Sequence, residues 1–161
     1  MGFVSSIIVV EDIPRSRRLY ADILGLKVTA DFGIYNVGFE GGLSMYRKVF
    51  FEELSGKPVD LGKHHNLVLY FEFERLEELE EEIAGNGFEF IHPIREQPWK
   101  QRIFRFYDYD QHVLEVAEKM DVVIARLRGE GHSIEDIAGM TGYSVDQVHL
   151  ELENHKKSAR N

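Results

Sequence analysis

Hydrophobic positions divide this chain into two similar series of short segments. Runs rich in β-branched and aromatic residues, bounded by turn residues, predict strands. They lie at residues 4–10, 26–31, 34–39 and 43–49 in the first series and at 67–73, 88–91, 103–107 and 113–117 in the second. In each series apolar residues at helical spacing follow the first strand and predict a helix, at residues 14–24 and 76–84. The pattern therefore predicts a β-α-β-β-β order that occurs twice.

Local signals fix the ends of the first predicted helix. Asp12 suits the N-cap, Pro14 suits the first turn, and Gly25 suits the position after the last turn. Residues 4–10 are a nearly continuous apolar, β-branched run, which predicts a strand buried on much of both faces. Residues 50–65 form a connection that is long for a structureless loop, so we expect a short helical turn or a pocket wall there.

After residue 118 the pattern becomes helical. Helices are predicted at residues 120–128, at 133–139 and from 144 onward. Ser133 and Asp136 resemble a capping box, and Ser144 suits the cap of the last helix. In that last helix the helical spacing of Val145, Val148 and Leu152 predicts that they face inward.

The last two predicted helices, with a short turn at Gly142, resemble a helix-turn-helix. DNA binding requires phosphate-facing Lys and Arg, but residues 119–161 contain six basic and seven acidic residues. Asp146, Glu151 and Glu153 place negative charge on the helix that would enter the groove. We therefore expect a helical appendage that packs over a pocket or a dimer seam, and we expect no nucleic-acid partner.

Several residues near the end of the second series are candidates for ligand binding. Glu115 is the one carboxylate in the strand at 113–117, where it would act as a base or bind a cationic group, or would form a structural ion pair with Arg102 or Arg105. Trp99, with Gln97 and Arg102, lies on a connection bordered by proline and suits a pocket wall with polar anchors.

Aromatic and histidine side chains supply two further candidates. Most aromatic strand residues are expected in the core, but Tyr70 is the one we expect to stack on a flat ligand. A metal site built from His64, His65, His92 or His112 is an alternative, although histidines on turns are usually solvated.

Composition narrows the possible settings. The chain has 161 residues, 43% of them hydrophobic, which is enough for a full core. Cysteine is absent, which excludes disulfides and thiolate metal sites and fits a cytoplasmic location. We expect neither a signal peptide nor a membrane span, because no apolar run is long enough. A net charge of −9 disfavours nucleic acid and anionic membranes as partners.

Three stretches resemble the vicinal oxygen chelate superfamily, the group of glyoxalases, bleomycin-resistance proteins and extradiol dioxygenases. They are VVEDIPRSRRLYADILGLKV (9–28), LYFEFERLEELEEEIAGNGFEFIHP (69–93) and EQPWKQRIFRFYDYDQHVLEVAE (96–118). The resemblance implies an α+β fold in which two βαβββ modules, about 3–50 and 66–118, form a cleft. Residues 1–118 would then form the paired modules and 119–161 the helical appendage. The modules would pair within one chain or between the chains of a homodimer.

Members of this superfamily that use a metal take its ligands from the first and fourth strands of each module. The resemblance carries these positions to Ser5, Met45, Val68 (or Leu67) and Glu115. Only Glu115 has a side chain that binds a divalent ion well. The family's closing turn, Asp-Pro-Asp-Gly, is Asp-Tyr-Asp-Gln at residues 108–111, where a positive φ at Gln111 would be strained.

The resemblance and the missing ligands together favour a protein that binds a small, partly aromatic or apolar molecule without a catalytic metal, as the bleomycin-resistance branch does. One alternative is a metal-dependent lyase, isomerase or dioxygenase of the same superfamily that uses Glu115, with histidines completing the site. Another is a ligand-responsive regulator whose helical tail contacts nucleic acid or protein.

Overall fold

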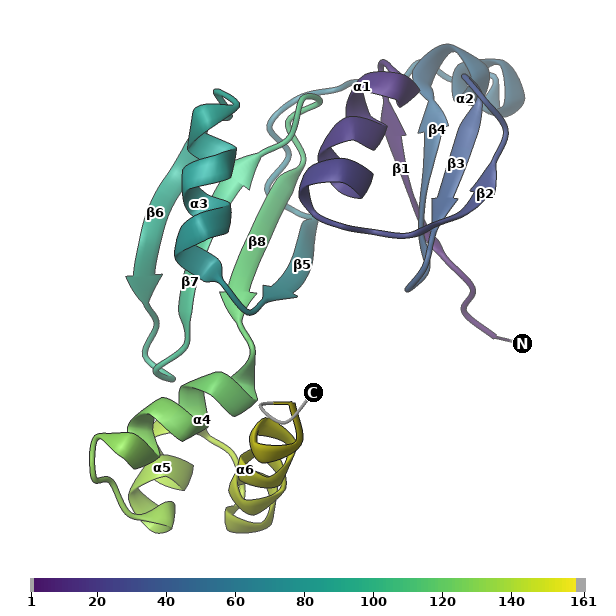
Figure 1. Cartoon of the computed structure of the whole chain (residues 1–161). Helices are drawn as coiled ribbons and strands as arrows, with labels where there is room; N and C mark the ends of the chain where they lie inside the picture. The colour runs from purple at the N-terminus through teal and green to yellow at the C-terminus, as the bar shows by residue number, and fades with distance from the viewer. Residues whose placement is uncertain (1, 159–161) are drawn as a thin grey trace. The chain divides into compact units, whose positions relative to one another are not determined.

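The computed structural model describes residues 2–158, which form two four-stranded sheets with flanking helices and a C-terminal group of three helices (Figure 1). Each sheet belongs to a βαβββ module, so the predicted α+β fold is confirmed. The chain divides into two compact units. One holds the first module together with Tyr107–Val113, and the other holds Val68–Phe106 and the chain from Leu114 onward.

The first module has its strands in the order β1-β4-β3-β2. Strand β1 is parallel to β4, whereas β3 is antiparallel to both of its neighbours. Its elements are β1 (Ser6–Val10), α1 (Ile13–Arg17), the π-helical segment η1 (Arg18–Ile23), β2 (Val28–Asp31), β3 (Asn36–Phe39), β4 (Leu43–Arg47) and α2 (Lys48–Ser55).

Helix α1 begins as the sequence predicts. The Oδ1 of Asp12 accepts a hydrogen bond from the backbone N–H of Arg15 at 2.7 Å, and Pro14 occupies the first turn. The helix then widens into η1, where the N–H of Leu24 donates to the carbonyl of Leu19 at 2.9 Å. Leu19 and Tyr20 are fully buried, so this segment covers one face of the sheet.

The burial predicted for the first strand is wrong. Strand β1 buries Ile8 and Val10, but Ile7 is 49% exposed, and Val4 lies outside the strand. Alternate side chains of a strand point to opposite faces, and helix packing buries only one face here. Ile7 therefore lies on the less buried face of β1.

The fourth strand is shorter than predicted because a helix replaces its end. Strand β4 ends at Arg47, and α2 then runs from Lys48 to Ser55. Gly56 ends α2 with φ +65°, a conformation that glycine adopts without steric cost. The helical turn expected in the connection after the fourth strand is therefore present, and it begins two residues earlier than expected.

The second module has its strands in the order β5-β8-β7-β6. Its elements are β5 (Val68–Phe73), α3 (Leu76–Gly85), β6 (Phe90–Glu96), β7 (Arg102–Tyr107) and β8 (Val113–Glu118). The buried face of α3 presents Leu76, Leu79 and Ile83. Phe104 and Phe106 are fully buried and contact Phe90, whose ring centroid lies 5.7 Å from that of Phe104.

Strand β6 extends beyond its predicted end, through a proline. Pro93 has no N–H, but β6 is the terminal strand of its sheet, where a missing donor is tolerated. The N–H of the next residue, Ile94, donates to Oε1 of Glu80 in α3 at 2.5 Å. The proline therefore interrupts the hydrophobic pattern without ending the strand.

The closing turn keeps the backbone shape that glycine usually supplies. Gln111 has φ +69°. The Oδ1 of Asp108 accepts hydrogen bonds from the N–H groups of Asp110 at 2.9 Å and His112 at 2.8 Å, and its Oδ2 accepts from the hydroxyl of Tyr20 at 2.8 Å. These bonds hold the turn and offset the strain at Gln111.

The C-terminal helices are α4 (Met120–Gly129), α5 (Ile134–Thr141) and α6 (Val145–Ser158). Ser133 and Asp136 form the predicted capping box. The helices share a core of their own, made by Val123, Ile124, Leu127, Ile137 and Val148. Val145 is 39% exposed, so the prediction that it faces inward is wrong; it lies in the first turn of α6. None of the helices within residues 2–158 has the length and apolar content that a membrane span requires.

Candidate ligand-binding site

The register of β1 and β4 shows which side chains occupy the less buried face of the first module. Ile8 pairs with Met45 and Ile7 pairs with Ser44. Met45 is fully buried on the helix side, whereas the hydroxyl oxygens of Ser5 and Ser44 lie 2.9 Å apart. Ser44 and Tyr46 therefore lie on the face of β4 opposite to that of Met45.

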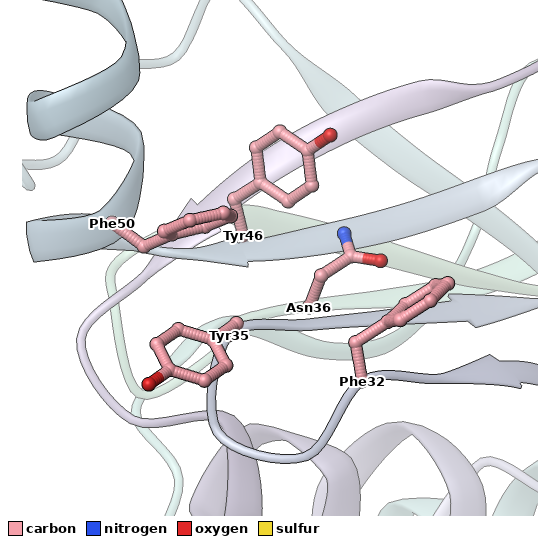
Figure 2. A pocket seen from close by; sticks show the side chains of 5 residues that line it. All are labelled: Phe32, Tyr35, Asn36, Tyr46 and Phe50. Carbon is pink, nitrogen blue, oxygen red and sulfur yellow. The ribbon is translucent and has the colours of Figure 1, made fainter.

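At one end of the first module, aromatic side chains surround a cavity of about 360 Å³. Figure 2 shows the five lining side chains, which come from the ends of β2, β3 and β4 and from α2. They are Phe32, Tyr35, Asn36, Tyr46 and Phe50. Small-molecule sites have volumes of about 300–1,000 Å³ and apolar linings with few polar groups. This cavity has both properties.

The rings of this aromatic pocket support one another. The ring of Phe50 lies 5.3 Å from that of Tyr35 and 5.8 Å from that of Tyr46, at interplanar angles of 59° and 78°. Tilted and edge-to-face contacts are favourable arrangements for aromatic rings. Phe32 stays 64% exposed and Tyr35 stays 52% exposed, so much aromatic surface is free to contact a ligand.

Asn36 is the polar group of the aromatic pocket. Its Nδ2 donates a hydrogen bond to the carbonyl of Met45 at 2.8 Å, and its residue pairs with Tyr46 across β3 and β4. Figure 2 shows its amide between Phe32 and Tyr46. The side chain therefore has a fixed position, with the amide oxygen as its second polar atom.

Sequence reasoning did not single out these five residues. The aromatic residues predicted to bind a ligand, Tyr70 and Trp99, belong to the second module. The aromatic residues of this pocket lie in the first module, at the turn after β2 and near the end of β4. The positions of Phe32 and Tyr35 in the sequence could have indicated this pocket. Phe32 and Tyr35 lie in a turn segment, where a core role is not required, and large apolar residues on turns are candidates for binding.

In the second module Glu115 forms an ion pair. Its Oε2 accepts a hydrogen bond from Nε of Arg105 at 2.5 Å, and the Nη2 of Arg105 contacts the same oxygen. The Nη1 of Arg105 also lies 2.9 Å from Nε2 of His92, whose Nδ1 is 2.8 Å from the carbonyl of Pro93. Arg105 is a permanent donor, so Nε2 of His92 accepts and Nδ1 carries the proton. The structural ion pair is the alternative that the geometry favours for Glu115.

Tyr70 and Trp99 are brought together by a residue that sequence reasoning missed. The buried amide of Gln101 donates from Nε2 to the hydroxyl of Tyr70 at 2.9 Å and to the carbonyl of Glu118 at 2.7 Å. Its Oε1 accepts from the indole N–H of Trp99 at 2.8 Å. Burial raises the pKa of Tyr70 to about 12, and the charges of Glu72 and Glu115 act in the same direction. Tyr70 is therefore a neutral phenol with an aromatic surface that is half exposed.

Arg102 and Gln97 border that group: Arg102 shares the partner Glu118 with Gln101, and the N–H of Gln97 donates to the carbonyl of Gln101 at 2.8 Å. Arg102 binds Glu118, with its Nε 2.7 Å from Oε1, and also binds Glu77 of α3. The hydrogen bond with Glu118 raises the pKa of Arg102 above its usual range. The side chain of Gln97 lies 3.5 Å from the carbonyl of Arg95 within the turn, and Val68 is 44% exposed on β5.

The four positions that the resemblance carries over are occupied by Ser5, Met45, Val68 and Glu115, and the carboxylate of Glu115 pairs with Arg105. Within residues 2–158 no group of three or more His, Asp or Glu side chains is arranged to hold a metal. The histidines have other contacts: His65 with Tyr107 at 2.5 Å and His112 with Asp108 at 2.9 Å.

The family of the chain follows from comparison with known proteins. The model of the glyoxalase-like domain matches residues 3–121. A structure of a protein of unknown function from Agrobacterium tumefaciens is 40% identical, with a TM-score of 0.66, and the match covers 74% of this chain and 94% of that one. No curated protein matches the chain.

Two further solved structures share the fold at lower identity. A glyoxalase/bleomycin resistance protein/dioxygenase from Nocardioides is 20% identical with a TM-score of 0.56, over 73% of this chain and 83% of that one. The fosfomycin resistance protein FosX from Listeria monocytogenes is 18% identical with a TM-score of 0.57, over 74% and 93%. Together with the two βαβββ modules, the domain match shows that the chain belongs to the glyoxalase-like family of the vicinal oxygen chelate superfamily.

Proposed function

We propose that this protein binds a small, partly aromatic or apolar molecule in the aromatic pocket of its first module and does so without a catalytic metal. The observation that supports this most directly is the cavity of about 360 Å³ with four aromatic walls and one amide. Apolar walls supply affinity through burial, and one placed polar group supplies orientation.

The names of the structural relatives are consistent with binding as a function. The relative from Listeria is a fosfomycin resistance protein, and the one from Nocardioides is described by three activities, one of which is bleomycin resistance. Sequestering a ligand requires a pocket but no reacting groups. The aromatic pocket meets that requirement, and its lining contains no Asp, Glu, His, Lys, Cys or Ser; its only reactive groups are the hydroxyls of Tyr35 and Tyr46.

Replacing Phe50 tests this proposal. We expect a panel of two-ring aromatic compounds to contain members that raise the thermal midpoint, and isothermal titration then measures their dissociation constants. Phe50→Ala removes a ring that contacts both Tyr35 and Tyr46, so binding should weaken roughly tenfold for a loss of about 1.4 kcal/mol.

Leu54→Ala is the matched control on the same helix, because Leu54 is 61% exposed and is not among the residues that line the pocket. Its affinity for the same compounds should equal that of the natural protein. Absence of binding by every compound, or equal affinities of the two variants, would count against the proposal. Circular dichroism of each unliganded variant separates lost binding from lost folding.

Catalysis through Glu115 is the second candidate, and the geometry favours it less. The ion pair with Arg105, whose two nitrogens both contact Oε2 of Glu115, stabilises the charged carboxylate and so weakens it as a base. Metal analysis of protein purified without chelator tests this candidate. A stoichiometric divalent ion that disappears in Glu115→Gln would establish the metal-dependent alternative.

We further propose a homodimer as the form in solution, since the resemblance includes module pairing between chains. Several large apolar side chains are exposed, among them Phe3, Val4 and Ile7. Exposed apolar surface of this kind is typical of interfaces. Light scattering after gel filtration should give twice the chain mass of 18.7 kDa, and a mass equal to that of one chain would contradict the dimer.

A further inference from the structure

We infer that the aromatic pocket selects planar ligands that carry an N–H or O–H donor and rejects anions. The Oδ1 of Asn36 would accept the hydrogen bond from that donor. This inference rests on the proposed function and specifies its ligand class. It follows from the orientation of one amide, from the chemistry of the surrounding rings and from the way in which the strand holds both.

The orientation of the Asn36 amide is fixed by its partner. An amide nitrogen and oxygen look alike in shape, so their assignment must come from hydrogen bonding. The carbonyl of Met45 can only accept, and it lies 2.8 Å from the Asn36 amide, so the atom that faces it is the donor Nδ2. Oδ1 is then the outward atom, and it accepts no hydrogen bond from any group within residues 2–158.

The backbone prevents the amide from turning away. Asn36 is the first residue of β3 and pairs with Tyr46 of β4. Its carbonyl also accepts a hydrogen bond from the N–H of Phe32 at 2.9 Å. Rotation of the side chain would break the bond to Met45 and leave a partly buried donor unpaired, which costs about 1–3 kcal/mol. The acceptor is therefore held in place before a ligand binds.

The lining disfavours negative charge. None of the five side chains around the cavity is charged, and the faces of aromatic rings carry a partial negative potential. The lining has two hydroxyl groups, one on Tyr35, which points away from Asn36 (Figure 2), and one on Tyr46. A carboxylate would lose hydration and meet Oδ1 and ring faces. An N–H group, neutral or cationic, would meet an acceptor and rings that also attract cations.

Four two-ring probes test the ligand class by isothermal titration. Indole has one N–H donor, benzofuran has the same shape without it, indole-3-acetate adds an anion, and tryptamine adds a cation. We expect indole to bind about 3- to 10-fold more tightly than benzofuran, which corresponds to one hydrogen bond. Indole-3-acetate should bind at least about tenfold more weakly than indole, and tryptamine at least as tightly.

The variant Asn36→Ala identifies the atom that reads the donor. In this variant the ratio of indole to benzofuran affinity should fall to about one, because the acceptor is gone. A ratio within one protein is insensitive to a partial loss of folding, which weakens both probes equally. If Asn36→Ala does not fold, the side-chain amide signal of Asn36 in the natural protein should shift further at saturation with indole than with benzofuran, because only indole donates a hydrogen bond to it.

The outcomes separate this inference from the proposed function. Equal affinities for indole and benzofuran, or tighter binding of indole-3-acetate, would overturn the ligand class while leaving the pocket as a binding site. A ratio that persists in Asn36→Ala would overturn the role of Asn36. Absence of binding by all four probes, or binding that Phe50→Ala does not weaken, would instead overturn the proposed function.

Discussion

Asp108 is a buried carboxylate whose two oxygens have four hydrogen-bond partners. The partners are the hydroxyl of Tyr20, two backbone N–H groups of the closing turn and Nδ1 of His112. Burial raises the pKa of Tyr20 well above its usual value, and the charge of Asp108 adds to the effect, so the phenol stays a donor. Asp108 thus joins the closing turn to η1, which contains Tyr20 and belongs to the same compact unit.

His112 makes the stability of this unit depend on pH. Burial lowers the pKa of His112, but the hydrogen bond and the charge of Asp108, with a contribution from Asp110, outweigh it and raise the pKa above its usual value. A raised pKa means that the folded state favours the protonated imidazole. The stabilisation is therefore complete below the unfolded pKa of about 6.5 and is lost as pH rises through the folded value.

Urea unfolding of His112→Gln at pH 6 and pH 9 checks this dependence. The natural protein should exceed the variant in free energy of unfolding by more at pH 6 than at pH 9. His149→Gln is the control, because His149 is exposed on α6, and its difference from the natural protein should not change with pH. A larger difference at pH 9 would show that the neutral imidazole is the stabilising form.

At the residue scale, the sequence predicted several possible roles for Glu115, and the packing of the folded chain favours one of them. The pairing of Glu115 with Arg105 was one of the alternatives that followed from composition and spacing. Asn36 could not be found in this way, because its importance depends on the carbonyl of Met45, which cross-strand register places beside it. A single sequence carries no signal for that register at a turn.

Helix α4 shows how an element is attached to its module by one side chain. Nη2 of Arg126 donates to the carbonyl of Lys100 at 2.7 Å and lies 3.5 Å from Oε2 of Glu118. Glu118 is buried and also binds Arg102. The Nε of Arg126 is buried without a hydrogen-bond partner among residues 2–158, so the anchor is not fully satisfied.

We expect Arg126→Ala to lower the free energy of unfolding by roughly 2 kcal/mol, the scale of a charge-assisted hydrogen bond lost at a partly buried site. Arg128→Ala is the matched control on the same helix, because Arg128 is exposed and binds the carbonyl of His132 within the C-terminal helices. It should cost less than about 1 kcal/mol. Urea denaturation measures both, and an equal loss in the two variants would contradict an anchoring role for Arg126.

At the element scale the order of strands and helices could be predicted, because their hydrophobic periods differ clearly. The boundaries that failed have local physical causes. Residues 48 and 49 continue an apolar run but begin α2, and β6 continues through Pro93 because a terminal strand needs fewer donors. Met45 faces the core, whereas its neighbour Ser44 faces the other side of the sheet, so a shift of one residue along β4 exchanges the two faces.

At the scale of the whole molecule, the family match does not extend over the C-terminal helices. The glyoxalase-like match ends at residue 121, within the first turns of α4. The Agrobacterium structure is 94% covered by 74% of this chain, so about a quarter of this chain lies outside that match. The helices have their own core, which is consistent with an added unit.

We predict that the 161-residue chain does not retard duplex DNA in a gel at low salt. The net charge is −9, and the exposed positions of α6 include Asp146 and Glu153, so approach to phosphates is repulsive. Asp146→Lys with Glu153→Lys provides the positive control, in which weak, salt-sensitive binding should appear if the helices can approach a groove. A shift by the natural chain that vanishes at high salt would identify a nucleic-acid partner.

The superfamily could be recognised from three stretches, because strand and helix signals recur in a characteristic order. The position of the aromatic pocket and the role of the appended helices could not be predicted from the sequence. Both depend on which faces of the sheets and helices stay exposed after packing. Phe32 lies in the turn after β2 and Phe50 lies in α2, yet both line one cavity.

The outer edge of β6 has a consequence for the behaviour of the protein at high concentration. Pro93 lacks an N–H and that of Ile94 is occupied by Glu80, so two consecutive positions offer no donor to an incoming strand. The charged side chains of Arg95 and Glu96 follow, both exposed. A strand that paired with this edge would therefore lack hydrogen bonds at these positions, which disfavours edge-to-edge aggregation into fibrils.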